Sequence, residues 1–312
     1  MAIKQNVTTT AQFTTSAREE DFVTRFTKNW DALRNIMGIM RPIRKAPGTK
    51  LVSYIAEVDG ELKGGAVAEG DEIPFTKMKV APKVYGDIEI SKYAKSVTIE
   101  SVSKYGADIA VEKTDEAFLT ALQNKVLGDF YKFLNTGSLA VEANTFQQAL
   151  ALAKGNVLDK FAGMDRDVTE VVGFANILDF YGYLGDKDIT TQTAFGLTYV
   201  KDYLGYSTLF LLPEKYIAKN KVIAVPVENI DLYYIDPADS DFAKLGLNYT
   251  VKGETNLIGV HVDGDYSRAT GDMYAIMGMK LWAEYLDGIA VATITPAAAE
   301  TGTKAAETGT KG

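Results

Sequence analysis

Apolar residues recur every three or four positions in three segments of the chain, a spacing typical of one face of an α-helix. The segments span residues 16–40, 114–135 and 145–161. The apolar positions of the first segment are Phe22, Phe26, Trp30, Leu33, Met37 and Met40. Those of the second are Phe118, Leu122, Val126, Phe130 and Phe133, with Leu119 and Leu127 beside them. We expect three amphipathic helices, the second about 33 Å long at ~1.5 Å per residue.

The ends of these helices carry capping signals. Ser16 precedes the first helix with Glu19 three residues later, the pattern of a reciprocal capping box. Acidic residues at Asp115 and Glu116 suit the first turn of the second helix, and Gly137 suits its end.

Two apolar runs, 51–58 and 73–80, read as β-strands joined by an unusual connection. The stretch from Val58 to Ile73 holds four glycines, five carboxylates and one lysine. A long connection without structure of its own is uncommon inside a compact domain. We therefore expect an extended β-hairpin loop whose contacts lie on another molecule.

The rest of the chain mixes short strands and turns. Residues 84–106 return the chain from the hairpin, and 169–186 reads as a buried strand running into another strand. Residues 191–237 alternate short apolar runs with turn signals, and 247–294 is rich in strand formers, with turns expected at 252–255 and at 262–265. The fold class predicted from this order is α+β.

Three segments lack apolar periodicity. Residues 1–16 read as an extended arm, and 41–50 reads as a linker that concentrates four basic residues. The sequence AAETGTK occurs twice, at 298–304 and 305–311, so we expect 296–312 to be a disordered repeat tail.

Composition excludes several function classes. The net charge of -8 and pI near 4.9 argue against binding nucleic acid through its phosphates. The chain has no cysteine, which excludes disulfides and thiolate chemistry, and its one histidine is His261. No signal peptide is recognisable, and no window approaches the ~20 apolar residues of a membrane span.

No motif indicates catalysis, so we expect no enzyme activity, no catalytic residue, no cofactor and no metal. The candidate clusters considered are His261 with Asp263, Asp265 and Asp272; Asp236, Asp239 and Asp241; Asp59 with Glu61; and Glu69 with Glu72. A β-turn at Asp263–Gly264 with carboxylates in solvent accounts for the first. The second cluster lacks the glycine and the distal glutamate of a calcium-binding loop. The last two clusters lie in the glycine-rich loop, which is a poor support for a preorganised site.

The order of these segments resembles the Hong Kong 97-type major capsid protein of tailed bacteriophages. The matching phrases are KSVTIESVSKYGADIAVEKTDEAFLTALQNKVLGDFYKFLNTG, VVGFANILDFYGYL, AVPVENIDLYY and GMKLWAEYLDGIAVATI, within about residues 20–295. The resemblance implies an N-terminal arm, an extended loop, a long spine helix, and peripheral and axial domains. Its boundaries are 1–49 for the arm and first helix, 50–85 for the extended loop, 86–139 for the peripheral domain with the spine helix, 140–238 for the axial domain, 239–295 for the return to the peripheral domain, and 296–312 for the tail.

The resemblance implies that the extended loop lies over a neighbouring subunit and that the arm crosses to one. The inter-subunit contacts expected on this basis are Asp59, Glu61, Lys63, Glu69, Asp71, Glu72, Arg41, Arg44, Lys45, Phe22, Phe26 and Trp30. Basic partners for the acidic loop are Arg41, Arg44, Lys45, Lys104 and Lys113. Some relatives cross-link a loop lysine; Lys63 stands at a suitable position, but a solvated charge is the simpler interpretation.

The implied function is that of a major capsid protein whose pentamers and hexamers enclose double-stranded DNA without reading its sequence. The implied location is the virion, assembled in the host cytoplasm, with no membrane. Portal and decoration proteins are candidate partners. Only about 20 residues precede the first helix, which indicates either a separate scaffolding protein or a chain already shortened; the initiating Met1 favours a separate scaffolding protein. Two alternatives stay open: an encapsulin-type shell protein, and an acidic small-molecule enzyme using His261.

Overall fold

The computed structural model describes residues 17–37, 39–185, 190–194, 197–227, 229–252 and 256–295. The predicted arm (1–16) and repeat tail (296–312) lie outside these residues. The chain forms two compact units. Unit 1 consists of Met1–Asp31, Arg41–Gln123 and Asp231–Trp282, and unit 2 consists of Ala32–Met40, Asn124–Ile230 and Ala283–Gly312. Both contain helices and strands, which confirms the α+β fold class.

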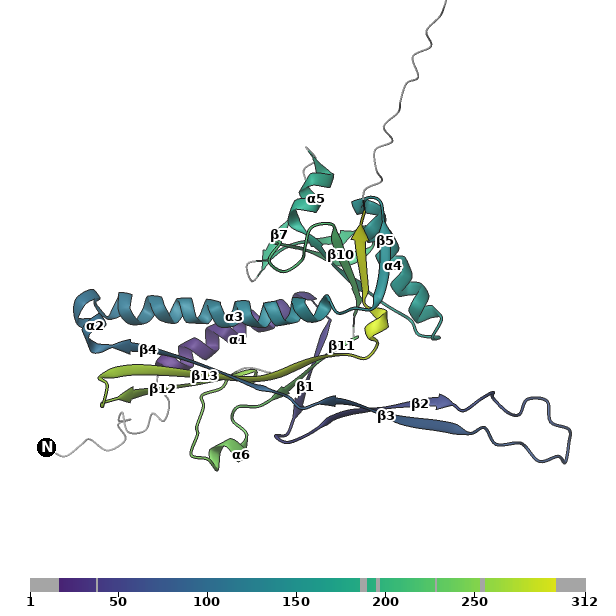
Figure 1. The fold of residues 1–312 in the computed structure, drawn as a ribbon, viewed down its shortest axis with the longest axis horizontal. Helices are drawn as coiled ribbons and strands as arrows, with labels where there is room; N and C mark the ends of the chain where they lie inside the picture. The colour runs from purple at the N-terminus through teal and green to yellow at the C-terminus, as the bar shows by residue number, and fades with distance from the viewer. Residues whose placement is uncertain are drawn as a thin grey trace, which may run out of the picture. The chain divides into compact units, whose positions relative to one another are not determined.

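Unit 1 is built on a five-stranded sheet (Figure 1). Its strands are β1 (Met40–Lys45), β4 (Ile90–Thr98), β11 (Ile230–Ile235), β12 (Ile258–Asp265) and β13 (Thr270–Ala283). The order is β1-β11-β13-β12, and β4 also pairs with β13. The long strand β13 therefore organises the sheet. Proline in β1 is tolerated because this strand lies at the edge, where one side needs no ladder hydrogen bond.

Helix α1 (Ala17–Met37) supplies core residues of unit 1. Phe22, Phe26 and Trp30 are all buried, as the spacing of three and four predicts, and the Phe22 ring lies 6.0 Å from the ring of Phe118. The proposed N-cap Ser16 lies outside the described residues. Glu19 is a buried carboxylate that accepts hydrogen bonds from Val262 and Thr250, a role that the capping pattern did not predict.

The predicted spine helix is α3 (Lys113–Leu134), which confirms the expected range 114–135 to within a residue. Two shorter helical segments precede it: α2 (Ile99–Tyr105) and the π-helix η2 (Asp108–Glu112). Helix α2 begins at the N-cap Thr98, whose hydroxyl accepts from the amide of Ser101. The sequence did not predict this helical extension.

Two strands of unit 1 stand apart from its main sheet. β2 (Leu51–Val58) and β3 (Met78–Gly86) form a two-stranded antiparallel ribbon, which we call the β2–β3 ribbon (Figure 1). They hydrogen-bond to each other and to no other strand that the structure describes. The base of the ribbon is fixed because Leu51 is buried with Ile88 and Ile235.

Unit 2 is built on a seven-stranded mixed sheet. Its order is β5 (Leu139–Ala143), β14 (Ala290–Ile294), β10 (Lys221–Pro226), β6 (Val171–Asn176), β9 (Tyr206–Leu212), β8 (Leu197–Tyr203) and β7 (Gln192–Ala194). Helix α4 (Phe146–Ala162) packs on β5, β10 and β14, and confirms the third predicted helix. The ring of Phe174 contacts Phe130 and Tyr131 of α3.

One expectation for unit 2 was wrong. The second half of 169–186 is helix α5 (Ile177–Leu184), because Asn176 accepts from the amide of Leu178 as an N-cap. Residues 290–294 pair with β5 and β10 in unit 2. The assignment of 239–295 to the peripheral domain stays a prediction. The remaining short helices are α6 (Ser240–Ala243) and η3 (Leu286–Gly288).

Two predictions of turns and linkers also need correction. The ladder between β12 and β13 continues through the pairs Asp263 with Asp272 and Gly264 with Gly271, so no turn forms at Asp263–Gly264. The turn spans 266–269, where Asp265 accepts from the amide of Ser267. The basic stretch 41–50 begins as strand β1 and is not all linker. Of the turn expected at 252–255, residues 253–255 lie outside the described part.

Candidate functional site

The β2–β3 ribbon has one apolar face. Alternate residues of a strand share a face, so its register decides which side chains come together. The cross-strand pairs include Val52 with Val84, Tyr54 with Pro82, and Val58 with Met78; Val80 lies between Met78 and Pro82 on the same face. We call this set the apolar ribbon face. Ala81, which follows Val80 on β3, lies on the opposite face of the ribbon.

The apolar ribbon face is open to solvent in the single chain. Tyr54 is 71% exposed and Val84 is 63% exposed, and Val52, Val58, Met78 and Val80 are exposed as well. Full burial of such a side chain stabilises a structure by ~1.5–3 kcal/mol. An isolated two-stranded ribbon is at best marginally stable in water. The face therefore lacks the cover that would normally stabilise it.

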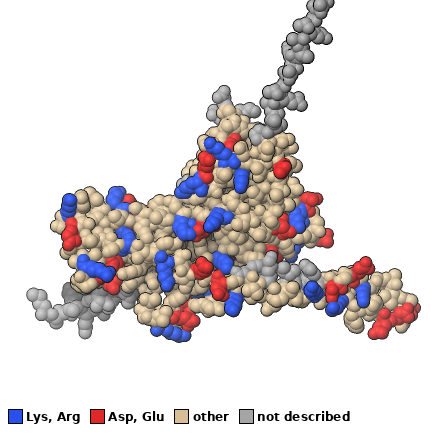
Figure 2. Space-filling model, in the orientation of Figure 1, with Lys and Arg blue, Asp and Glu red and all other residues tan. Residues whose placement is uncertain are grey.

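The connection between the strands forms a tip that is acidic and also carries exposed apolar side chains. Figure 2 shows carboxylates gathered at this end of the ribbon. Three large apolar side chains, Leu62, Ile73 and Phe75, are strongly exposed among them, Phe75 to 89%. The tip can therefore contact a partner through both charge and apolar area.

The tip has a definite backbone conformation. Lys63 and Thr76 close it, since the Lys63 amide donates to the Thr76 hydroxyl at 3.0 Å and that hydroxyl donates to the Lys63 carbonyl at 3.2 Å. Gly64 and Gly65 have φ of +113° and +112°, which L side chains rarely adopt. The glycines are thus required by the path of the chain.

The loop residues predicted as inter-subunit contacts are exposed. Asp59 pairs with Lys77 of the same loop at 2.5 Å, with both groups largely in water. The side chains of the others, Glu61, Lys63, Glu69, Asp71 and Glu72, are all exposed. Their contact with a neighbour stays a prediction.

The basic residues predicted to receive the loop have partners in their own chain. Arg41 donates from Nε to Asp231 at 2.8 Å, and Arg44 lies 3.3 Å from both Asp236 and Asp239. The Lys45 ammonium lies 5.0 Å from the centroid of the Tyr233 ring. The three cations lie on β1, and their partners lie on β11 or directly after it. These contacts therefore stabilise the edge of the sheet of unit 1.

Phe22, Phe26 and Trp30 were also predicted as inter-subunit contacts. All three are buried in the chain itself, each with at most 2% of its surface exposed. They have no area left for a neighbour, so we leave them out of the contacts proposed below.

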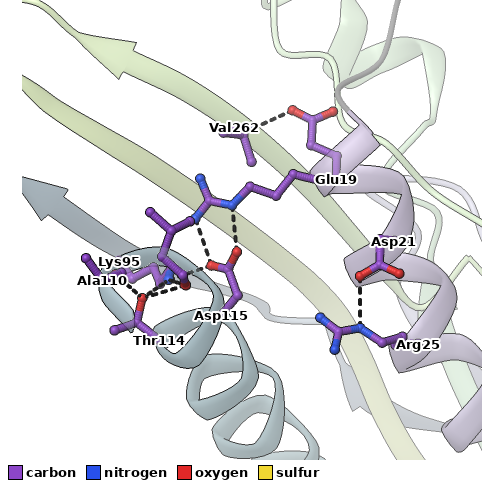
Figure 3. Close-up of polar contacts among 10 residues, drawn as sticks. Glu19, Asp21, Arg25, Lys95, Ala110, Thr114, Asp115 and Val262 are labelled. Carbon is purple, nitrogen blue, oxygen red and sulfur yellow. Dashed lines mark hydrogen bonds and ion pairs between the residues drawn. The ribbon is translucent and has the colours of Figure 1, made fainter. Parts of the chain in front are cut away.

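A buried charge cluster fixes the junction of α1, β4 and α3 (Figure 3). Asp115 accepts from Arg18 Nε at 2.6 Å and Nη2 at 2.7 Å, and its carboxylate lies 2.5 Å from Lys95 Nζ. Bidentate pairing of this kind is the strongest form of charged hydrogen bond. We call these three residues the Asp115 cluster.

The electrostatics of the Asp115 cluster follow from burial and pairing. Burial alone would raise the pKa of Asp115, but hydrogen bonds from Arg18 and Lys95 outweigh it and lower that pKa. Burial lowers the pKa of Lys95, and Asp115 offsets the effect only in part. The sequence suggested Asp115 only as a residue at the start of a helix. Arg18 and Asp115 are 97 positions apart, so no local sequence pattern predicts that they pair.

The same cluster satisfies the π-helix. Thr114 donates its hydroxyl to the carbonyls of Ala110 at 2.8 Å and Val111 at 2.9 Å, and Lys95 Nζ lies 2.5 Å from that hydroxyl. A π-turn disturbs the regular ladder of an α-helix, so its carbonyl groups need other donors. These contacts supply them.

Three carboxylates of the candidate clusters have structural partners. Asp272 accepts from Ser96 at 2.6 Å, Asp236 from Asn256 at 3.0 Å, and Asp239 from the amide of Asp241 at the start of α6. Among the residues that the structure describes, no three His, Asp or Glu side chains are grouped to hold a metal ion. In the same residues no helix is long and apolar enough to cross a membrane.

Neither the known family models nor the curated proteins match this sequence. Solved structures do. A chain of the bacteriophage PhiM1 mature capsid matches with TM-score 0.54 and 7% identity, covering 83% of this chain and 86% of that one. The chain has the Hong Kong 97-type capsid fold.

Two further structures agree. A chain from Mycobacterium phage Patience matches with TM-score 0.52 and 9% identity, covering 90% of this chain and 88% of that one. A chain from Microbacterium phage Oxtober96 matches with TM-score 0.51 and 12% identity, covering 84% and 90%. At identities this low, the structural matches establish the fold alone. The function must be argued from the surface of the chain.

Proposed function

We propose that this chain is the major capsid protein of a tailed bacteriophage, which assembles with copies of itself into the pentamers and hexamers of an icosahedral shell around double-stranded DNA. The observation that carries the proposal is the uncovered apolar ribbon face on a chain with the capsid fold. A monomer gains nothing from exposing such a face, whereas a neighbouring copy can cover it.

Symmetry makes this arrangement effective. Each copy covers the ribbon of another, so every subunit both gives and receives one contact. Many modest contacts closed by symmetry then stabilise a shell that no single contact could hold. In this proposal unit 1 corresponds to the peripheral domain with the extended loop and the first half of the spine helix, and unit 2 corresponds to most of the axial domain with the second half of that helix.

The partners in this proposal are other copies of the chain, a portal protein, a separate scaffolding protein and a decoration protein, and the site of action is the virion. The DNA is enclosed without sequence-specific contacts, which agrees with the acidic composition. No step of this function requires a catalytic residue, so the proposal includes no enzymatic activity.

The decisive experiment compares two lysine substitutions on neighbouring residues of β3. Val80→Lys places a charge on the apolar ribbon face, and Ala81→Lys places the same charge on the opposite face; both positions are exposed in the single chain. Each protein is coexpressed with its neighbouring genes and examined by electron microscopy and sedimentation.

We expect closed shells from the unmodified chain and from Ala81→Lys, and unassembled subunits from Val80→Lys. Shells that tolerate Val80→Lys would rule out the apolar ribbon face as the contact. A chain that stays monomeric without any substitution would overturn the capsid function itself. Large shells that package DNA support the phage head, while small shells that hold an enzyme cargo would favour an encapsulin-type compartment.

A further inference from the structure

Unit 1 contains a second apolar feature, away from the β2–β3 ribbon. A groove of about 420 Å³ opens among the end of β4, helix α2 and the turn between β12 and β13. Its lining includes the side chains of Val97, Ile99, Val102, Val111, Tyr266 and Arg18. We call it the α2 groove.

The charged groups at the α2 groove already have polar partners in the chain. Arg18 is held by both carboxylate oxygens of Asp115, at 2.6 and 2.7 Å. Asp265 accepts from the hydroxyl of Ser267 at 2.6 Å and from its amide at 2.9 Å. What the groove offers to an incoming group is therefore mainly apolar area, which suits an uncharged side chain.

Part of the α2 groove is uncovered in the described part of the chain. Ile99 is 61% exposed and Tyr266 is fully exposed. Large apolar side chains gathered around a groove are typical of a binding surface, whereas a single exposed one needs no explanation.

The occupant is indicated by where the described chain begins. Sixteen residues precede Ala17, and Arg18, one position further on, lines the groove itself. The only aromatic residue among these sixteen is Phe13, which stands among threonines and glutamine. Four residues of extended chain reach at most ~13–14 Å, so Phe13 lies within range of the groove.

We propose that Phe13 of the same chain binds in the α2 groove. The arm is then anchored on its own subunit, and only residues 1–12 extend beyond the anchor. The short connection between Phe13 and Ala17 gives the side chain a high effective concentration at its own groove, which favours it over the arm of another copy. This inference does not depend on assembly, because an isolated chain contains both parts.

Disulfide trapping tests the proposal directly. The chain has no cysteine, so Thr14→Cys with Ile99→Cys gives a protein with only those two thiols and leaves Phe13 in place. Because a disulfide requires Cα atoms ~4.4–6.8 Å apart, oxidation reports close approach. We expect a cross-link within one chain, and much less of it in the matched control that adds Phe13→Ala to the same two cysteines, because the control keeps the short connection but lacks the ring that anchors the arm.

The products identify the occupant on a non-reducing gel. A faster-migrating monomer supports the proposal. A cross-linked dimer would overturn it in favour of an arm donated by another copy. Absence of any cross-link, or equal cross-linking in the Phe13→Ala control, would overturn it as well, because Phe13 would then not hold the arm at the groove.

A second measurement needs only one cysteine. Ile99→Cys alone is labelled with a maleimide, with and without Phe13→Ala. A bound phenylalanine protects the thiol, so we expect labelling to become roughly tenfold faster in the Phe13→Ala background. Phe13→Trp should restore protection, and Leu152→Cys, at an exposed residue of α4, should label at one rate in all backgrounds. An unchanged rate at Ile99→Cys would refute the proposal.

Discussion

Strand β6 of unit 2 and the β2–β3 ribbon of unit 1 are both rich in apolar residues but have opposite environments. All six residues of β6, Val171–Asn176, are buried. On the ribbon, Tyr54 and Val84 are largely exposed. The apolar content of a strand does not tell whether its own chain will cover it.

The difference lies in the neighbours of each strand. β6 has β10 on one side and β9 on the other, α4 and α5 contribute to the core on one face, and the rings of Phe130 and Tyr131 lie against Phe174 on the other. The ribbon has only its own two strands. One element is completed within the chain, and the other is completed, in our proposal, by a second copy.

The largest expected effect comes from Phe174→Ala. Phe174 is fully buried and stacks on Phe210 at 5.4 Å, so truncation leaves a cavity among aromatic rings. The free energy of unfolding should fall by about 3–5 kcal/mol, measured by urea denaturation of the unassembled chain. The control is Leu178→Ala on the exposed side of α5, which should change it by less than about 0.5 kcal/mol. Equal effects would show that β6 is less tightly covered than its burial indicates.

The elements that periodicity predicts well are those whose contacts are internal. The stripe of α3 was found because Leu122, Val126 and Phe130 follow the helical repeat and are buried. Helix α4 was found for the same reason. The hairpin was also found, through its glycines and carboxylates, but its second strand was predicted at 73–80 and lies at Met78–Gly86. The register that creates the apolar ribbon face follows only when both strands are aligned.

The missed features depend on single side chains or on distant pairing. Helix α5 was read as a strand because its residues are nearly all apolar, yet Asn176 at its start was a usable N-cap signal. The turn after β12 was placed at Asp263–Gly264 on local turn chemistry, but the pairing with β13 extends the strand to Asp265. The Asp115 cluster joins three separate segments, so no local pattern could reveal it.

The next largest effect is expected from Asp115→Asn. The substitution removes the charge that holds Arg18 and Lys95, leaving two partly buried cations without their acceptor. The free energy of unfolding should fall by about 2–3 kcal/mol. The matched control is Asp129→Asn, whose ion pair with Lys125 is exposed and should contribute less than about 0.5 kcal/mol. A loss no larger than that of the control would contradict the structural role of the cluster.

The pH dependence sharpens this test. The pKa of Asp115 in the folded chain lies below its ordinary value of 3.8, so the folded state favours the charged carboxylate. Its contribution is present above about pH 4 and is lost as the pH falls through the lowered pKa. The difference in unfolding free energy between the unmodified chain and Asp115→Asn should therefore shrink on acidification below about pH 4. If this difference in unfolding free energy does not change with pH, the effect of Asp115→Asn comes from altered packing and not from the lost charge.

The smallest effect on the single chain is expected from Phe75→Ala, the same chemical change as at Phe174. Phe75 is 89% exposed at the tip of the ribbon, so its removal leaves no cavity and should alter the free energy of unfolding by less than about 0.5 kcal/mol. In the assembled shell the result should differ, because a tip that lies against a neighbour would bury this ring. We expect shells of Phe75→Ala to dissociate at lower urea concentration than unmodified shells, while the unassembled chains unfold alike. If shells and single chains are both unaffected, the tip makes no apolar contact, and the contrast between β6 and the ribbon applies only to the apolar ribbon face.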